Sequence, residues 1–566
     1  MGARAMTDKD LAPADSRPIV TVVITCRERH GLTEGMIEAL VRSIRMPVRL
    51  LYLDVCTPEW LRVRIAARAV DWGLEVIRID EPLWPSQARR RVAELIETKY
   101  AVFMDNDVHV LPGWLERIIA CAEETGAGIV GPLYLWGEDE HTDRIHMGGG
   151  ELRSTPEAGG IVLNERHRYF SKKLDEVELK REQCDFVEFH CMLMRREVYT
   201  APDVFNEEIV CVHEHIHAAL ICRQMGYEIY MEPSARVVYF AFSPYALSDL
   251  ELFRWRWSLD AGDSSLKAFA KRWGVIDDAR SFGVRTFLVR HRQQVDPIRP
   301  SLQDPIRSKE PMQEGDLKQT ITGLLDLAHS RGYTADDLAQ IKKAHWSALV
   351  LSSGGYRPCG RPFVNHLIGT ASVLVHFGFE TRVVVGGLLH AAYTHAPRMR
   401  GAQETVDTVA RWLGGADTPT ERTVRGYTVR SSRWTQLSML DNWQDVATTD
   451  DIEIALIAMA NLVDMRLSGE IRVTGRADDD DIAVLSKADE ICAVVGIPGL
   501  AVSLHGDENG ARLEIFADDK RPKGSFRLEG PKMVPMVNRA FFNVQRSVTA
   551  NAQPAVDGVT EERAVS

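Results

Sequence analysis

Long apolar runs, paired cysteines and an excess of basic residues are all missing from this chain of 566 residues. No stretch approaches the roughly 18 consecutive apolar residues that a membrane span requires. The nine cysteines are scattered without a CxxC pair, which favours reduced core thiols over disulfides or a zinc site. Acidic residues outnumber basic ones by 80 to 68, for a net charge of -12, so no general affinity for nucleic acid is expected.

The N-terminal residues 1–17 carry mixed charge and no apolar segment. We therefore expect a disordered tail and not a signal peptide, and a cytoplasmic protein. With 45% hydrophobic and 26% charged residues, the composition is typical of a globular chain. At about 150 residues per domain the length allows two to four domains, and we expect two.

The stretch YAVFMDNDV at residues 100–108 carries the first candidate site. Four largely apolar residues lead into Asp105, Asn106 and Asp107, so a buried strand is predicted to end in two carboxylates. Ligands of open α/β sheets bind at that end of the strands. Two oxygen ligands one residue apart suit Mg²⁺ or Mn²⁺. For the triplet alone, an acidic turn is a simpler interpretation than a metal site. The segments around the triplet decide between these two interpretations.

Short apolar runs alternate with helical patterns before this triplet. The runs are PIVTVVITC, RLLYLDVC and LEVIRID, and the helical patterns cover residues 32–45, 58–72 and 86–98. This alternation is typical of βαβ units and a mainly parallel sheet. The triplet then follows about the fourth strand, as a nucleotide site requires. Residues 137–173, which include His146, are predicted to be loop-rich.

Glu214, His215 and His217 stand at the start of a later predicted helix. An acidic residue at a helix N-terminus is favoured by the helix dipole and can be a simple cap. His215 and His217 are two residues apart and face different sides of a helix, so we do not expect both to bind one ion.

The order of these segments resembles the family 2 glycosyltransferases of the GT-A fold, over roughly residues 18–275. The matching segments are VTVVITCRERHG, LDV, SQARR, DND, EFHCMLMRREVY and HEHIHAALICRQMGYEIYMEPSARVVY. The resemblance implies a domain at residues 18–291 with a nucleotide-diphospho-sugar transferase fold. It also implies metal-assisted, inverting transfer of a sugar from a nucleotide-sugar donor to an acceptor hydroxyl or another nucleophile. The acceptor stays open among natural products, glycans and proteins.

The resemblance also implies roles for single residues. Asp54 would contact the nucleobase, Asp105 the ribose or the metal, and Asp107 a manganese or magnesium ion that bridges the donor's diphosphate. Glu214 or His215 would be the general base, which removes the acceptor's proton. The other residues expected at the site are Thr25, Arg27 and Arg89 for the donor, and His190, His217 and Trp255 for the acceptor cleft.

The chain departs from the family pattern in three places. The family usually has Glu-Asp at the base with another Asp shortly after, so the HEHIH sequence leaves the base open between Glu214 and His215. Arg90 stands where an asparagine is frequent, and Tyr239 stands where many members have a metal-binding histidine. These changes predict an unusual acceptor or weak activity on an intact fold.

Residues 292–315 are rich in proline, glutamine and charge, and they are predicted to be a linker. From residue 316 long helical patterns follow one another, interrupted by strand-like runs only at ARLEIFADD and GSFRLEG. We expect a mostly helical domain at 316–545 and a disordered tail at 546–566.

Within this second half, GRPFVNHLIGTASVL and VVVGGLLHAAY resemble the HD phosphohydrolase superfamily, and especially an HD-like family with an HLxGT pattern. In catalytic members an Asp follows the second His and another Asp lies on a later helix. Here Ala391 follows His390, and Asn461 stands near the later position, with Asp464 three residues on. The expected HD-like site, which lacks those carboxylates, comprises His366, His390, His395 and Asn461.

Loss of the carboxylates predicts a degenerate domain with a regulatory or acceptor-binding role, because a divalent ion needs their charge. The alternative is a nucleotide phosphohydrolase in which the N-terminal domain serves as a binding module, with His395 as a substitute ligand. A non-catalytic scaffold is a third hypothesis. Metal analysis separates the first two, since the ion would be lost with Asp107 in one and with His390 in the other.

Overall fold

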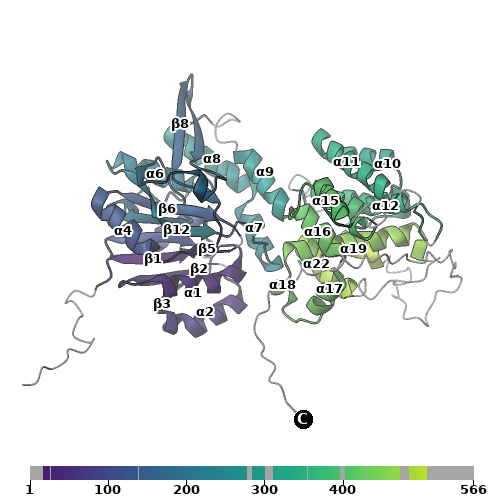
Figure 1. The fold of residues 1–566 in the computed structure, drawn as a ribbon, viewed down its shortest axis with the longest axis horizontal. Helices are drawn as coiled ribbons and strands as arrows, with labels where there is room; N and C mark the ends of the chain where they lie inside the picture. The colour runs from purple at the N-terminus through teal and green to yellow at the C-terminus, as the bar shows by residue number, and fades with distance from the viewer. Residues whose placement is uncertain are drawn as a thin grey trace, which may run out of the picture. The chain divides into compact units, whose positions relative to one another are not determined.

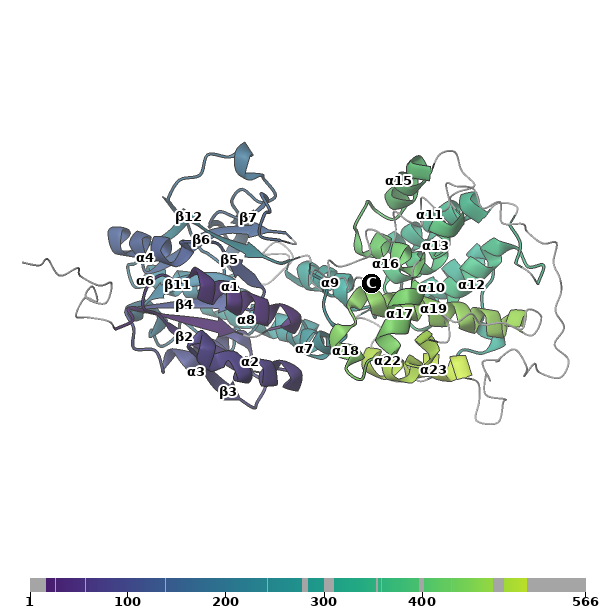
Figure 2. The ribbon, with the colours of Figure 1, turned by 60° about the horizontal axis from the view of Figure 1, so that its bottom comes forward.

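The computed structural model describes residues 17–505, apart from 26, 56, 138, 242, 277–283, 300–309, 353–354, 358, 396–401, 429 and 472–482. The chain divides into two compact units, Met1–His291 and Arg292–Ser566 (Figure 1, Figure 2). Most of both predicted tails, part of the predicted linker and the strand-like runs after residue 510 lie outside the described residues.

A ten-stranded mixed sheet forms the centre of the first unit, in the order β10-β12-β6-β11-β4-β1-β2-β3, with β5 beside β12 and β7 beside β6. In the run β4-β1-β2-β3, each strand pairs in parallel with its neighbour. By contrast, β11 runs antiparallel to both of its neighbours, β4 and β6. β12 and β6 also pair in parallel. The mainly parallel sheet that we expected is therefore a mixed sheet, interrupted by antiparallel strands such as β11, because strand direction is set by connections that periodicity does not report. The strands of this sheet are β1 (Val20–Thr25), β2 (Arg49–Val55), β3 (Leu74–Ile79), β4 (Tyr100–Asp105), β5 (Val108–Val110), β6 (Ile129–Trp136), β7 (Ile145–Met147), β10 (Glu182–Gln183), β11 (Cys191–Arg195) and β12 (Ile229–Tyr239).

Helices connect the parallel strands as the alternating pattern predicts. The third ends earlier than expected, at Ala93, because the chain must turn into β4. The helices of this unit are α1 (Thr33–Ser43), α2 (Glu59–Trp72), α3 (Pro85–Ala93), α4 (Trp114–Thr125), α5 (Arg196–Tyr199), α6 (Glu214–Gln224), α7 (Leu250–Arg256) and α8 (Leu259–Trp273), and α9 (Val284–Val295) continues past the unit boundary.

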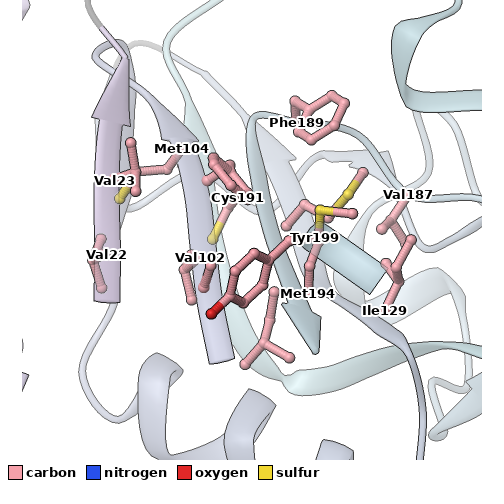
Figure 3. Close-up of a cluster of buried hydrophobic side chains, with 14 of the residues drawn as sticks. Val22, Val23, Val102, Met104, Ile129, Val187, Phe189, Cys191, Met194 and Tyr199 are labelled. Atoms are coloured by element: carbon pink, nitrogen blue, oxygen red, sulfur yellow. The ribbon is translucent and has the colours of Figure 1, made fainter. Parts of the chain in front are cut away.

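Apolar side chains of β1, β4 and β11 fill the core beneath the site (Figure 3). Val22, Val102 and Cys191 are fully buried, as expected of strands covered on both faces, whose sequences are nearly continuous apolar runs. Burial raises the pKa of the Cys191 thiol, so this cysteine is a protonated core residue. The end of β4 is thereby held rigidly.

A two-stranded hairpin of β8 (Gly150–Glu157) and β9 (Gly160–His167) projects from the first unit (Figure 1). The prediction that residues 137–173 are loop-rich is therefore wrong for these strands. Most of β8 is exposed, so the strand lacks the apolar alternation by which a half-buried strand is recognised. Gly150 lies against Phe186, and a Cβ atom there would come within 2.3 Å of the ring.

The second unit is helical throughout its described residues, apart from isolated bridges. Its central helix, α19 (Thr449–Leu467), is buried on nearly every side and packs against α12, α13 and α16. In the part of the chain that the structure describes, no helix is both long enough and apolar enough to cross a membrane. The other helices are α10 (Ile321–Ser330), α11 (Ala335–Ser352), α12 (Phe363–His376), α13 (Thr381–Leu389), α14 (Ala392–His395), α15 (Ala402–Trp412), α16 (Pro419–Thr428), α17 (Arg430–Ser438), α18 (Trp443–Val446), α22 (Ala488–Val495) and α23 (Pro498–His505).

Candidate active site

Three predicted donor residues lie at the ends of neighbouring strands. Thr25, the last residue of β1, pairs with Asp105, the last residue of β4. Asp54 on β2 lies one position beyond Leu53, which pairs with Thr25 on the other side. Asp54 and Asp105 are 5% and 2% exposed. The predicted donor end of the site is thus a buried, acidic edge of the sheet.

Asn106, between Asp105 and Asp107, holds the loop after β1. Its Oδ1 accepts a hydrogen bond from the backbone N–H of Arg27 at 2.8 Å. Its Nδ2 donates to the carbonyl oxygen of Glu28 at 3.1 Å and to Oγ1 of Thr33 at 3.0 Å. Sequence analysis did not assign this role, although a fully buried amide needs such partners.

The loop that Asn106 holds brings two arginines to the two carboxylates. Nε of Arg27 lies 3.0 Å from Oδ1 of Asp105, and Nη1 of Arg29 lies 2.8 Å from Oδ2 of Asp107. Arg29 has a left-handed backbone with φ of 59°, which is uncommon outside glycine and turns its side chain toward Asp107.

The two carboxylates differ in their protonation behaviour. Burial by itself raises the pKa of Asp105, but Arg27 and His190 bring it down to about 2. Burial dominates at Asp107 and raises the pKa of its carboxyl above the usual value, although Arg29 opposes it. An additional positive charge beside Asp107 would favour its ionised form.

His190 completes the cluster at Asp105. Its Nδ1 lies 3.0 Å from Oδ2 of Asp105, and its ring stacks on Tyr239 at a centroid distance of 4.1 Å. Ligand atoms of Asp105, Asp107 and His190 lie within 4.8 Å of one another. Two carboxylates and one imidazole are a donor set that fits Mn²⁺ or Mg²⁺. Sequence analysis had expected His190 in the acceptor cleft.

A second group of histidines surrounds Glu188 next to this cluster. His146 and His190 approach one oxygen of Glu188, at 2.9 and 3.4 Å, and His167 lies 3.5 Å from the other. Burial by itself raises the pKa of Glu188, but the three histidines hold it well below the usual range. Sequence analysis missed His167 and Glu188, because residues from separate strands meet only in the folded chain.

The two candidate bases lie in different environments at the start of α6. Oε1 of Glu214 is 3.7 Å from Arg89 and 3.9 Å from Arg27, the two arginines that also approach Asp105. Burial by itself raises the pKa of Glu214, but these arginines bring it below the usual value. His215 instead lies 3.7 Å from Glu165 on β9.

Arg89 on α3 is a buried cation. It is 1% exposed, and its guanidinium lies 3.7 Å from the ring centroid of Phe189. Its three guanidinium nitrogens are buried and make no hydrogen bond to a described residue. Burial, aided by Arg27, lowers the pKa of Arg89 to about 9. Such a group favours an anion beside it.

His217 and Trp255, the other two residues predicted for the acceptor cleft, make separate contacts. His217 is buried, with Nε2 2.6 Å from the carbonyl oxygen of Asp203 and Nδ1 accepting from Trp273 at 3.0 Å. This histidine therefore joins α6 to α8. Trp255 stacks on Trp84 at a centroid distance of 3.9 Å and lines a surface cavity of about 740 Å³.

In the second unit, the histidine of the HLxGT segment contacts a buried carboxylate. Nδ1 of His366 lies 2.7 Å from Oδ2 of Asp464, and Arg361 contacts both oxygens of Asp464, at 2.8 and 3.0 Å. A Cβ atom at Gly369 would lie 1.8 Å from Oδ1 of Asp464, so only glycine leaves room for it. Burial raises the pKa of Asp464 to about 6.

The other residues of the predicted HD-like site surround Tyr427. The His390 ring lies 5.5 Å from the His366 ring and 4.9 Å from the Tyr427 ring. Asn461 donates to the Tyr427 hydroxyl at 3.4 Å. The side chain of His395 lies outside the described residues. Among those that are described, both groups of close metal-ligand side chains belong to the first unit.

Residues 21–201 match the sequence model of glycosyl transferase family 2. The matching segment lies within the first unit. A protein of Sinorhizobium fredii (strain NBRC 101917 / NGR234), described as uncharacterized protein y4gI, is 22% identical over 247 residues, which are 42% of this chain and 26% of that protein. The chain thus spans about a quarter of the length of this relative.

Two solved glycosyltransferase structures are similar to part of the chain. GalNAc-T7, crystallised with UDP, GalNAc and Mn²⁺, is 15% identical, with a TM-score of 0.30 over 39% of this chain and 43% of its own. TarS of S. aureus is 11% identical, with a TM-score of 0.28 over 44% of this chain and 42% of its own.

Proposed function

We propose that this protein transfers a sugar from a nucleotide-sugar donor to an acceptor hydroxyl or another nucleophile, with inversion at the anomeric carbon. The observation that carries the proposal is the convergence of Asp105, Asp107 and His190 within 4.8 Å. This group lies at the end of β4, inside the segment that matches glycosyl transferase family 2. The donor end of such a sheet is where a diphosphate binds.

Asp105, Asp107 and His190 would hold a Mn²⁺ or Mg²⁺ ion. When bound, the ion offsets the negative charge that develops on the departing nucleoside diphosphate. Arg27 and Arg29 orient the two carboxylates through their ion pairs. Arg89 supplies a further positive charge in a buried setting, where its interaction with a phosphate is weakly screened.

Glu214 is the general base in this proposal. It is ionised at neutral pH, since its pKa is lowered, and it shares Arg27 and Arg89 with Asp105. A base must approach the acceptor hydroxyl while that hydroxyl attacks the anomeric carbon, so a place beside the donor end is required. His215 is directed to Glu165 on the hairpin and would act on Glu165 and not on the acceptor.

The helical unit has a regulatory or acceptor-binding role in this proposal. Both oxygens of Asp464 are already engaged by Arg361 and His366. A phosphohydrolase site needs that carboxylate for its metal ions. The cytoplasmic location expected from the sequence stays a prediction.

The test uses the full-length chain and begins with a thermal-shift screen of nucleotide diphosphates and nucleotide sugars with Mn²⁺, because a ligand of the native state raises its stability. Hydrolysis of the identified nucleotide sugar is then measured for Asp107→Asn. We expect turnover to fall by about 100-fold or more. Asp80→Asn removes an acid that is 79% exposed and should leave turnover unchanged. Equal turnover in Asp107→Asn and the wild type would overturn the assignment.

A further inference from the structure

A second group of ligand side chains meets at Glu188, beside the proposed Mn²⁺ site. His146 comes from β7, His167 from the end of β9, and Glu188 precedes β11. Nε2 of His146 lies 2.9 Å from one oxygen of Glu188, and Nε2 of His167 lies 3.5 Å from the other. Three segments that are distant in sequence thus bring two imidazoles to one carboxylate.

The spacing of this group is close to that of a metal centre. One ligand atom from each of the three residues lies within 4.8 Å of the others. Bonds of about 2.0–2.2 Å to zinc place two ligand atoms of one ion about 3–4 Å apart. Small side-chain rotations therefore suffice to bring all three atoms onto one ion.

Aromatic side chains surround the two histidines. The His146 ring lies 5.5 Å from the Trp136 ring and 5.6 Å from the Tyr239 ring, and the His167 ring lies 6.0 Å from the Phe186 ring. Such walls limit ring movement and exclude water, and both effects strengthen metal binding. The group is therefore enclosed by aromatic side chains, as a metal site is, and is not an exposed cluster of charges.

His167 forms part of the wall of a cavity of about 510 Å³. Arg166 and Lys172 line the same cavity. Three protein ligands leave at least one coordination position for water or another ligand. The two cations suit an oxyanion in that position.

We propose that His146, His167 and Glu188 form a second divalent-metal site, which prefers Zn²⁺ and has an open position toward this cavity. Two imidazoles and one carboxylate are the donor set of open zinc sites. The neighbouring site has two carboxylates and suits the harder Mn²⁺ or Mg²⁺ ions. The second site does not depend on the proposed sugar transfer, because its test measures bound metal and not turnover.

The choice of variants follows from the contact between the two sites. Nε2 of His190 lies 3.4 Å from Glu188, so a change at Glu188 disturbs both sites. His146 and His167 are therefore the residues to change. The Asp107→Asn background removes one carboxylate from the first site and so weakens zinc binding there.

The experiment loads full-length Asp107→Asn with Zn²⁺, removes unbound metal by desalting and measures zinc by mass spectrometry. We expect one zinc ion per chain, and a fall to background when His146→Gln and His167→Gln are added. His141→Gln is the matched control, since it removes a histidine whose side chain is 84% exposed, and it should retain the zinc. Loading with Co²⁺ should give visible ligand-field absorption that the double histidine substitution abolishes.

Two results would overturn the proposal: no zinc retained by the Asp107→Asn chain, or equal zinc in the chain with both histidines replaced. Calorimetry of the metal-free proteins shows whether the first unit remains folded. If the double substitution abolishes its transition, the single His146→Gln and His167→Gln variants replace it. Each should weaken Zn²⁺ binding by about tenfold or more, and unchanged affinity in both contradicts the site.

Discussion

Nδ1 of His190 lies 3.0 Å from Oδ2 of Asp105, although the two residues belong to β11 and β4 regions separated by 85 positions. The contact exists because β11 runs antiparallel beside β4 and pairs Cys191 with Met104. The antiparallel strand thus adds an imidazole to a pair of carboxylates that the parallel strands present.

The first prediction concerns this imidazole. His190→Gln should weaken Mn²⁺ binding by about 10-fold to 100-fold, because it removes one of three ligand side chains. Isothermal titration of Mn²⁺ into the full-length chain measures the change. His141→Gln should bind Mn²⁺ as the wild type does. Unchanged affinity in His190→Gln would show that only the carboxylates hold the ion.

The second prediction separates the two candidate bases. Glu214→Gln should lower turnover of the nucleotide sugar by about 100-fold to 10,000-fold, because an amide cannot accept the acceptor's proton. Mn²⁺ and nucleotide binding should stay near the wild-type values. His215→Gln should retain most of the turnover, since that ring is directed to Glu165. A larger loss of turnover in His215→Gln than in Glu214→Gln would identify His215 as the base.

The third prediction is a pH dependence of stability at the contact between Glu165 and His215. Burial by itself raises the pKa of Glu165, but His215 and the neighbouring histidines bring it from 4.5 to about 2. Burial by itself lowers the pKa of His215, but Glu165 raises it above 6.5. The carboxylate's contribution is present above pH 4.5 and is lost as the pH falls toward 2. The imidazolium's contribution is present below pH 6.5 and is lost as the pH rises through the folded-state pKa.

Glu165→Gln should therefore destabilise the first unit most between pH 4.5 and 6.5, where both groups are charged. A cost of about 1–3 kcal/mol is expected when a buried charged group loses its partner. Calorimetric unfolding of both proteins across the acidic and neutral range measures the difference. The same difference at every pH would mean that ionisation of this pair does not stabilise the fold.

The fourth prediction concerns Gly369 in α12. Alanine in place of a glycine within a helix normally raises stability by about 0.5–1 kcal/mol. Gly369→Ala should instead lower the stability of the second unit by about 1–3 kcal/mol or more, because its Cβ atom would lie 1.8 Å from Asp464. Gly35→Ala in α1, where nothing lies within 4 Å of the added atom, should stabilise the first unit. Calorimetry reports both, and a stabilising Gly369→Ala would contradict the close approach.

Local patterns in the sequence predicted those features that depend on neighbouring residues. Alternating apolar runs and helical patterns predicted the first four strands and their helices, and long helical periods predicted the second unit. The hairpin of β8 and β9 escaped prediction, because exposed polar strands leave no alternation. The role of Asn106 depends on hydrogen bonds to the loop after β1, which residue order along the chain does not show.

By itself, the sequence determined that Asp105 and Asp107 follow a buried strand and that a helical region succeeds an α/β region, because adjacent residues along the chain carry both signals. Only the tertiary structure decided which partners meet these acids. His190 arrives on an antiparallel strand, Arg89 from α3, and the Glu188 group from three separate segments. Such contacts depend on strand order and direction, which hydrophobic periodicity does not report. The set of side chains at the site is therefore decided by the mixed sheet, whereas the position of the site at the end of β4 can be predicted from the sequence.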